Sequence, residues 1–209
     1  MLRAVAVVGV LATTLVVVSP VVPNPGTPPP AAGGGGTPAP RSLARVPPGG
    51  PEWITIPAIG VSAAVRGVTS THEQGSWLII PPMQTNADLR RVYWWNEHAA
   101  PADPSTGTVY LYGHACTHYA LCAFNHLDEL VKGDLVNVTT TRGTLTYRVA
   151  AAPIRLAKTA AGIGASSIYN YDIVNRLALI TCGYAANGLS PWNWVVITQL
   201  VAARAGGSR

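Results

Sequence analysis

The chain has 209 residues and a formal net charge of +5 at pH 7, and its Lys and Arg residues form no run. This length predicts one folded domain, alone or with appendages. Nucleic-acid binding is disfavoured, because phosphate backbones are bound by clustered Lys and Arg side chains. We therefore expect no nucleic-acid partner.

The first segment, residues 1–22, is an apolar run of mostly Val, Ala and Leu that follows Arg3. A short basic region before an apolar stretch is typical of an export signal. The run is also just long enough for a short membrane span. No small-x-small cleavage pattern decides between a cleaved signal peptide and a retained membrane anchor. Both alternatives predict an extracytoplasmic protein, either membrane-anchored or secreted at the cell surface.

The second segment, residues 23–50, is dense in Pro, Gly and Ala and includes Pro28-Pro29-Pro30 and Gly33-Gly34-Gly35-Gly36. Such a composition cannot bury enough apolar surface to offset the entropy lost on ordering. We expect a disordered linker here. A folded domain is then predicted over residues 51–203, followed by a flexible tail over residues 204–209.

Short strand patterns dominate the predicted domain. Runs rich in β-branched and aromatic residues, bounded by Pro or Gly turns, predict strands over residues 53–56, 77–80, 108–112, 134–139, 144–149, 176–181 and 194–201. Helical patterns are few and predict a short helix over residues 124–131 and a short turn near residues 165–168. Many short strands with Gly and Pro turns are typical of an all-β barrel or sandwich.

The sequence contains three cysteines, Cys116, Cys122 and Cys182. Two nearby cysteines in an exported protein usually form a disulfide, so we expect Cys116 and Cys122 to be bonded. Cys182 is then left as a free thiol. A metal site with His114 and His118 is the alternative, but the cysteine spacing is unusual for zinc. We expect no metal and no other cofactor.

Two predicted strands end in residues that can form a reactive pair. One runs into Gly113-His114, and the other runs into Cys182-Gly183. Strand ends combine a rigid base with an open edge, as a catalytic group requires. A thiolate is the nucleophilic form of cysteine, and a nearby imidazolium favours it. The pair predicts thiol catalysis, with a structural histidine and a buried core cysteine as the alternative.

Together these motifs resemble the sortase family of cell-wall cysteine transpeptidases. The resemblance covers about residues 52–201, and three stretches carry it. Leu179-Ile180-Thr181-Cys182 is similar to the end of the family's TLxTC signature, and Ile54 to Val61 is similar to its IPxIGV strand. The third stretch, similar to the family's GH…F..L..L..GD pattern, consists of Gly113-His114, Phe124, Leu127, Leu130 and Gly133-Asp134. The motifs look most like the actinobacterial groups, classes E and F. The resemblance implies a closed sortase-type β-barrel of about eight strands, with one or two short helices.

The resemblance also implies roles for the reactive pair. Cys182 would attack a sorting-signal peptide and form a thioacyl intermediate. His114 would act as the general acid and base, and the backbone after Cys182 would help to hold the oxyanion. The implied partners are the sorting-signal peptides of surface proteins and an amine acceptor on a cell-wall precursor or a pilin. The N-terminal segment would hold the protein at the membrane.

The sequence departs from the family at the third catalytic position. Sortases carry an Arg just ahead of the apolar core of the strand that follows the cysteine, and here Trp192 or Asn193 stands at that place. Asn193 can donate a neutral hydrogen bond but supplies no charge. We expect Asn193 to be a partial substitute, with Arg155 as the second candidate. The expected substrate-binding residues are Thr181, Tyr184, Trp192 and Arg155.

The predicted function is therefore an exported sortase-like cysteine transpeptidase. The missing Arg leaves a second hypothesis, a catalytically degenerate sortase-fold module that binds peptides. A third hypothesis, an L,D-transpeptidase or an NlpC-type peptidase, is disfavoured because their Ser-His-Gly-Cys and Cys-before-His arrangements are absent from the sequence.

Overall fold

The computed structural model describes residues 46–69, 85–103, 107–116, 122–158, 167–183 and 190–206, all within one compact unit that begins at Arg41. The predicted N-terminal segment 1–22, most of the predicted linker and the predicted strand over residues 77–80 lie outside these ranges. Within them, no helix has both the length and the apolar character needed to cross a membrane.

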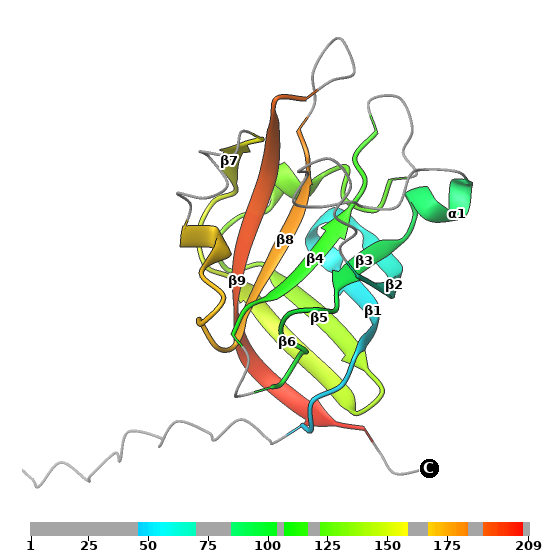
Figure 1. The fold of residues 1–209 in the computed structure, drawn as a ribbon, viewed down its shortest axis with the longest axis vertical. Coiled ribbons are helices and arrows are strands. Elements are labelled where there is room, and N and C mark those ends of the chain that lie inside the picture. The colour runs from blue at the N-terminus through cyan, green and yellow to red at the C-terminus, as the bar shows by residue number, and fades with distance from the viewer. Residues whose placement is uncertain are drawn as a thin grey trace, which may run out of the picture. The chain divides into compact units, whose positions relative to one another are not determined.

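Nine strands form one sheet, and eight of them close into a barrel (Figure 1). The sheet order is β6-β5-β1-β2-β3-β4-β8-β9-β7, and an additional β6–β9 pairing closes the ring and leaves β7 outside it. The predicted closed barrel of about eight strands is confirmed. The strands are β1 (Pro51–Ile56), β2 (Val61–Val68), β3 (Val92–Trp95), β4 (Val109–Gly113), β5 (Leu135–Thr140), β6 (Gly143–Val149), β7 (Ile154–Ala157), β8 (Arg176–Cys182) and β9 (Trp192–Ala205).

The long strand β9 holds the closure together. Its first part pairs with β8 on one side and with β7 on the other, from Ala157↔Trp192 to Ile154↔Val195. Its second part pairs instead with β6, as far as Gly143↔Ala205. The strand β7 therefore pairs with the first residues of β9, along the edge of β9 that β6 leaves open there. β9 continues through residues 204 and 205, where the sequence predicts a flexible tail.

The helical elements are all short: α1 (Asn86–Leu89), η1 (Pro57–Ile59), η2 (Leu127–Glu129) and η3 (Ser167–Tyr169). The predicted helix over residues 124–131 is reduced to the 3-10 turn η2. Phe124, Leu127 and Leu130 recur every third residue and are all buried. A spacing of three matches the 3-10 repeat, so one short turn is enough to bury all three side chains.

Three strands, β2, β3 and β7, were not predicted from the sequence. β2 contains two adjacent alanines and Gly67, which are poor strand formers. β3 and β7 have only four residues each, too few to show a clear alternation. These strands form because their neighbours in the sheet offer hydrogen-bond partners, which a single segment of sequence does not reveal.

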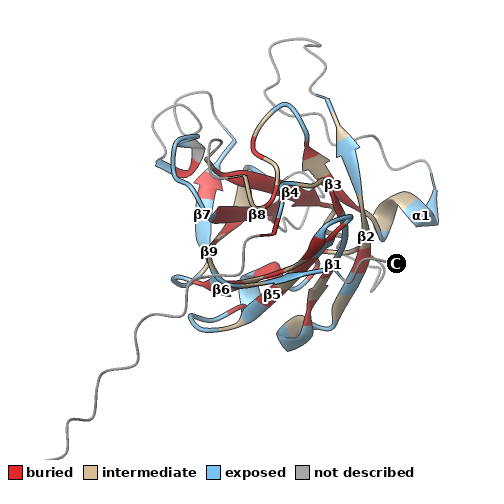
Figure 2. Cartoon of the chain, turned by 90° about the horizontal axis from the view of Figure 1, so that it is seen from below, coloured by how far each residue is buried: buried red, intermediate tan, exposed pale blue. Residues whose placement is uncertain are grey.

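The barrel wall separates two apolar cores. Side chains that point inward fill the barrel with residues such as Leu111, Leu179 and Val196, and Figure 2 shows the ring of strands around this buried interior. Side chains that point outward from β3, β4, β8 and β9 form a second cluster, completed by Leu156 of β7 and Ile168 of η3. Successive strand residues face opposite sides, so the same four strands supply both cores.

Arg176, the first residue of β8, is buried and holds η3 against the barrel. Its Nε donates to the Thr108 hydroxyl at 2.7 Å, and Nη2 donates to the carbonyls of Ile168 and Asn170 at 2.7 and 2.6 Å. Nη1 donates to the Ser167 carbonyl at 3.2 Å. Arg176 therefore has a structural role, and it lies at the other end of β8 from Cys182.

We expect Arg176→Met to lower the free energy of unfolding by about 2–4 kcal/mol, because it leaves buried carbonyls without their donor. Urea denaturation would measure the change. Arg148→Met is the matched control, since Arg148 is an exposed strand residue on β6, and we expect it to change stability by less than about 0.5 kcal/mol. Equal losses in the two variants would contradict the structural role of Arg176.

His98 lies in a cluster of aromatic side chains just beyond β3. Its ring stacks on Tyr171 with centroids 4.5 Å apart, and it meets the edge of Trp95 at 3.8 Å and of Tyr110 at 6.0 Å. Burial lowers the pKa of His98 from its ordinary value, and the neighbouring Glu97 carboxylate opposes this only in part. The folded state therefore favours the neutral imidazole.

We expect the stability contributed by neutral His98 to be lost as pH falls below about 6.5, because the unfolded chain then binds a proton that the folded chain resists. Urea denaturation at about pH 7.5 and about pH 5.5 would compare the wild type with His98→Gln. The wild type should lose more stability on acidification than the variant does. An equal loss in both proteins would rule out His98 as the source.

Candidate active site

Cys182 is the last residue of β8, and His114 follows the last residue of β4, a neighbouring strand that runs in the same direction. β4 and β8 pair in parallel from Val109↔Leu177 to Gly113↔Thr181. His114 follows Gly113, and Cys182 follows Thr181, so both come one position after the last of these pairs. The pairing brings a histidine and a free, half-buried cysteine to the same edge of the barrel.

Both residues belong to the outer face of the barrel wall. Cys182 continues the outward series of Ala178 and Ile180 in β8, and His114 continues that of Tyr110 and Tyr112 in β4. The Tyr93 ring, which is part of the same outer cluster, makes a T-shaped contact with the His114 ring, with centroids 6.0 Å apart. The side chains of His114 and Cys182 thus lie next to the outer core.

The third predicted residue, Asn193, lies directly opposite Cys182 in the β8–β9 register. Directly opposed residues of an antiparallel pair project to the same side of the sheet. Asn193 is half-buried and belongs to the same outward series as Val195. The structure therefore brings Asn193 beside the cysteine, as its sequence position predicts.

A lysine that was not predicted from the sequence contacts the cysteine directly. Lys158 Nζ donates to Cys182 Sγ at 3.3 Å. Its backbone N–H donates to the Pro191 carbonyl at 3.0 Å, which extends the β7–β9 ladder by one residue beyond Ala157↔Trp192. Lys158 follows β7, the short strand that the sequence pattern does not reveal, so no sequence signal connects it with Cys182.

Arg155, the second candidate for the missing Arg, has a different environment. Its guanidinium lies over the rings of Trp192 and Trp194, 5.0 and 4.8 Å from their centroids. Arg155 pairs with Trp194 in the β7–β9 register, whereas Leu156 pairs with Asn193. The contacts of its guanidinium are thus with the indole rings beside the site, and the positive group that contacts the sulfur is Lys158.

Thr181 and Gly183 flank the cysteine and serve the packing of the strand end. Thr181 is buried, and its hydroxyl donates to the Gly113 carbonyl at 2.8 Å, which joins β8 to β4 through a side chain. The N–H of Gly183 donates to the Trp192 carbonyl at 3.0 Å. This N–H, the first after Cys182, is therefore already engaged within the sheet. Tyr184 lies outside the described residues.

A disulfide encloses the loop that follows His114. Cys116 and Cys122 are bonded to each other, as the sequence predicts. The Cys116 N–H donates to Asn125 Oδ1 at 2.6 Å, and the Phe124 N–H donates to the His114 carbonyl at 3.2 Å. These contacts fix the backbone around His114. The alternative metal site would need both cysteines as free thiolates, whereas the structure has them bonded.

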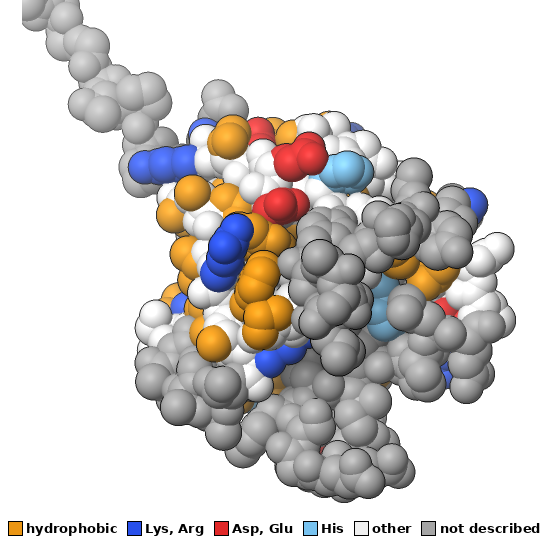
Figure 3. All heavy atoms as spheres, turned by 90° about the horizontal axis from the view of Figure 1, so that it is seen from above, with side chains coloured by type: hydrophobic (Ala, Val, Ile, Leu, Met, Phe, Trp, Pro, Cys, Tyr) orange, Lys and Arg blue, Asp and Glu red, His pale blue; other side chains and the backbone are white. Residues whose placement is uncertain are grey.

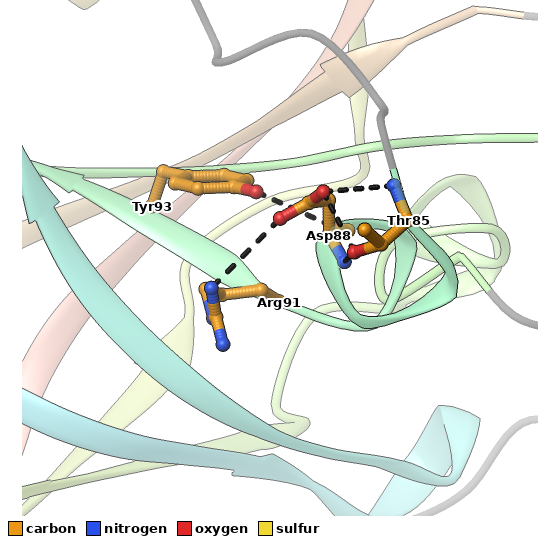
Figure 4. Close-up of polar contacts among 4 residues, drawn as sticks. All are labelled: Thr85, Asp88, Arg91 and Tyr93. Carbon is orange, nitrogen blue, oxygen red and sulfur yellow. Dashed lines mark hydrogen bonds and ion pairs between the residues drawn. The ribbon is translucent and has the colours of Figure 1, made fainter.

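Polar contacts from α1 support the tyrosine that touches His114 (Figure 4). The Tyr93 hydroxyl donates to the Asp88 carbonyl at 3.4 Å. The Asp88 carboxylate accepts from the backbone N–H of Thr85 at 2.9 Å and from its hydroxyl at 2.8 Å, and Arg91 lies 3.8 Å from it. Burial and the Asp88 charge raise the pKa of Tyr93, so its phenol stays protonated.

The end of the barrel where β8 ends and β9 begins is shown from above in Figure 3. On the described surface, Lys and Arg side chains lie among apolar ones, and the acidic side chains gather toward one side.

Gly183 is required where it stands, because the Trp192 indole packs against its Cα. A methyl group added at Gly183 would meet Trp192 Nε1 and Cδ1. We expect Gly183→Ala to lower the free energy of unfolding by about 1–3 kcal/mol and to slow alkylation of Cys182, because the strand end that carries the sulfur must shift. Thermal denaturation and iodoacetamide labelling would measure the two effects.

Gly67→Ala is the matched control for this substitution. Gly67 lies in β2, and an added methyl there meets the end of the Asn96 side chain at 3.3 Å. We expect normal labelling of Cys182 in this variant. A Gly183→Ala protein that labels as fast as the wild type would contradict the close packing of Trp192.

Three solved structures show the same fold as this chain. Sortase E1 from Streptomyces coelicolor, solved with a tripeptide in its active site, has a TM-score of 0.55 and 20% identity over 78% of this chain and 94% of its own. Sortase A from Listeria monocytogenes has a TM-score of 0.54 and 17% identity over 75% and 90%. Sortase C-1 from Actinomyces oris has a TM-score of 0.51 and 22% identity over 71% and 70%.

No curated protein matches the chain. The model of the sortase domain family, in contrast, matches residues 54–201, which is most of the chain and almost the whole described barrel. The match includes the strands that carry His114, Cys182 and Asn193. The chain belongs to the sortase family.

Proposed function

We propose that this protein is an exported cysteine transpeptidase of the sortase type. It cleaves a sorting-signal peptide through a thioacyl-enzyme and transfers the acyl group to an amine. One observation carries the proposal: the parallel pairing of β4 with β8, which ends at Gly113↔Thr181 and brings His114 and Cys182 to one edge of the outer face. Members of the family are cysteine transpeptidases, and this edge holds the two groups that such chemistry needs.

In the first half-reaction, the Cys182 thiolate attacks the scissile carbonyl carbon of the peptide. As the tetrahedral intermediate collapses, the C–N bond breaks and the imidazolium of His114 gives its proton to the leaving amine. The product is a thioester on Cys182 and a free amine. The engaged N–H of Gly183 leaves the Asn193 amide as a neutral donor for the carbonyl oxygen.

In the second half-reaction, an acceptor amine attacks the thioester. His114, now neutral, takes the proton that the amine loses, and the C–S bond breaks to restore the thiolate. Each proton that leaves His114 in the first half-reaction is thus returned in the second. The net reaction exchanges one amide bond for another and needs no cofactor.

The substrate lies, in this proposal, along the outer face at the ends of β8 and β9, where Cys182 and Asn193 project. Trp192 and Arg155, which were expected to bind it, lie on the opposite face of β9 and β7. Its partners are sorting-signal peptides of surface proteins and an amine on a cell-wall precursor or a pilin. A pilin is a substrate of sortase C from Streptococcus pneumoniae, a protein that shares this fold. We place this chain with the actinobacterial classes E and F, at the cell surface, held there or exported by residues 1–22.

A degenerate peptide-binding module is the second candidate. The observation that favours it is the sequence itself, in which no Arg stands between Ser190 and Ile197. Loss of one oxyanion donor typically costs a factor of roughly 100 to 1000 in rate. The two candidates differ in one measurable property, since only the enzyme forms a covalent acyl intermediate.

We expect the full-length protein, incubated with a library of sorting-signal peptides, to gain the mass of an acyl fragment on Cys182. Cys182→Ala should abolish the adduct, and His114→Gln should slow its formation by about 100- to 10,000-fold. Intact-protein and peptide-mapped mass spectrometry would measure both. Retained turnover in Cys182→Ala would disprove the thiol mechanism.

Circular dichroism would check that both variants keep the barrel. Lys132→Ala, a substitution in the turn before β5, is the control for a remote change. If the wild type binds a peptide from the library and carries no adduct at any time, the degenerate binding module is the correct account.

A further inference from the structure

We propose that Lys158 is a catalytic residue of this protein and supplies the positive charge at the reactive sulfur. Its ammonium stabilises the Cys182 thiolate before the reaction and the carbonyl oxyanion during it. The inference rests on the proposed transpeptidase chemistry, but it concerns a residue that lies outside every sequence motif. Lys158 thereby provides the positive charge that the missing Arg would supply.

The carrying observation is the contact of Lys158 Nζ with Cys182 Sγ at 3.3 Å. An ammonium group has three N–H donors and no acceptor. One donor can therefore face the sulfur while a second faces an oxygen of a bound peptide. Charge-assisted hydrogen bonds of this kind are about twice as strong as neutral ones. The amide of Asn193 could provide only a neutral hydrogen bond.

The backbone of Lys158 is fixed by the sheet, although its side chain is exposed. Ala157 pairs with Trp192, and the Lys158 N–H donates to the Pro191 carbonyl at 3.0 Å. Leu156, two residues earlier, is buried in the outer core. Leu156 and Cys182 both pair with Asn193, so β7 and β8 are held at a fixed register on either side of β9. The approach of Lys158 to the sulfur follows from this register.

The other candidates for the charge are placed differently. Arg155 lies on β7 as well, but its guanidinium stacks on Trp192 and Trp194. Arg176 is bound to backbone carbonyls at the opposite end of β8. Because successive strand residues project to opposite faces, Arg155 lies on one face of β7 and Leu156 and Lys158 lie on the other. The short strand β7 thus delivers a lysine to the sulfur from the side of β9.

The charge balance of the reaction fits an ammonium at this position. When the thiolate attacks the carbonyl carbon, a C–S bond forms and the negative charge moves from sulfur to the carbonyl oxygen. Sulfur and oxygen are then bound to the same carbon, so a cation beside the sulfur is also close to the oxygen. Lys158 keeps its proton throughout, and His114 carries out the proton transfers. When the intermediate collapses, the C–N bond breaks and the charge on oxygen is lost.

The test compares two alkylating reagents of similar size, anionic iodoacetate and neutral iodoacetamide. Their rates with Cys182 are measured on the full-length, unreduced protein, in which Cys116 and Cys122 are bonded. The ratio of the two rates reports the charge next to the sulfur, because the nucleophilicity of the thiolate cancels in the ratio. The proteins compared are the wild type, Lys158→Ala, Lys158→Arg and Lys132→Ala, and Lys132 is the other lysine in the sequence.

We expect the iodoacetate-to-iodoacetamide ratio to fall by about two- to fivefold in Lys158→Ala, the size of one exposed charge contact. Lys158→Arg should restore the ratio toward the wild-type value. Lys132→Ala should leave the ratio unchanged.

An unchanged ratio in Lys158→Ala would overturn the proposal. If labelling then still depends on His114, the thiol-imidazole pair stands and only the role of Lys158 falls. If Cys182 of the wild type does not label at all, the proposed transpeptidase function falls with it. Thermal denaturation of each variant would confirm that the barrel is intact, as expected for an exposed side chain.

Discussion

The parallel pairing of β4 with β8 is the constraint on which the rest of the site depends. These strands are far apart in the sequence, and their backbone ladder from Val109↔Leu177 to Gly113↔Thr181 fixes which residues meet at its end. The hydroxyl of Thr181 adds a side-chain bond to the Gly113 carbonyl at 2.8 Å. A slip of one residue would turn Cys182 to the opposite face. The register of this pair therefore decides that His114 and Cys182 lie at the same edge of the barrel.

The second core explains why the reactive residues lie on the outside of the barrel. Outward side chains of β3, β4, β8 and β9 need an apolar cover, and Leu156 and Ile168 help to provide it. The covering strand β7 can pair with β9 only where β6 has left that strand. At the end of this cover, Lys158 meets the sulfur. The segment from β7 to Lys158 thus covers part of the outer core and also places a cation beside the sulfur of Cys182.

Much of this arrangement was predictable from the sequence, for reasons visible in particular residues. Apolar runs at 108–112 and 176–181 predict strands that end at His114 and Cys182, and the spacing of Cys116 and Cys122 predicts their disulfide. The resemblance to sortases pointed to Trp192 or Asn193 at the position of the missing Arg, and the β8–β9 register pairs Asn193 with Cys182. By contrast, β3 and β7 are four residues long and show no alternation, so their presence was not predicted.

The sequence by itself indicated the family and the strand ends at which Cys182 and His114 stand, because strand patterns and motif order are local properties of the chain. Only the tertiary structure decided which charged side chain reaches the sulfur. Arg155 and Lys158 are three residues apart by number, yet one stacks on indole rings and the other contacts Cys182. That difference depends on the register of β7 on β9. A register is set by hydrogen bonds between distant segments, which no local pattern encodes.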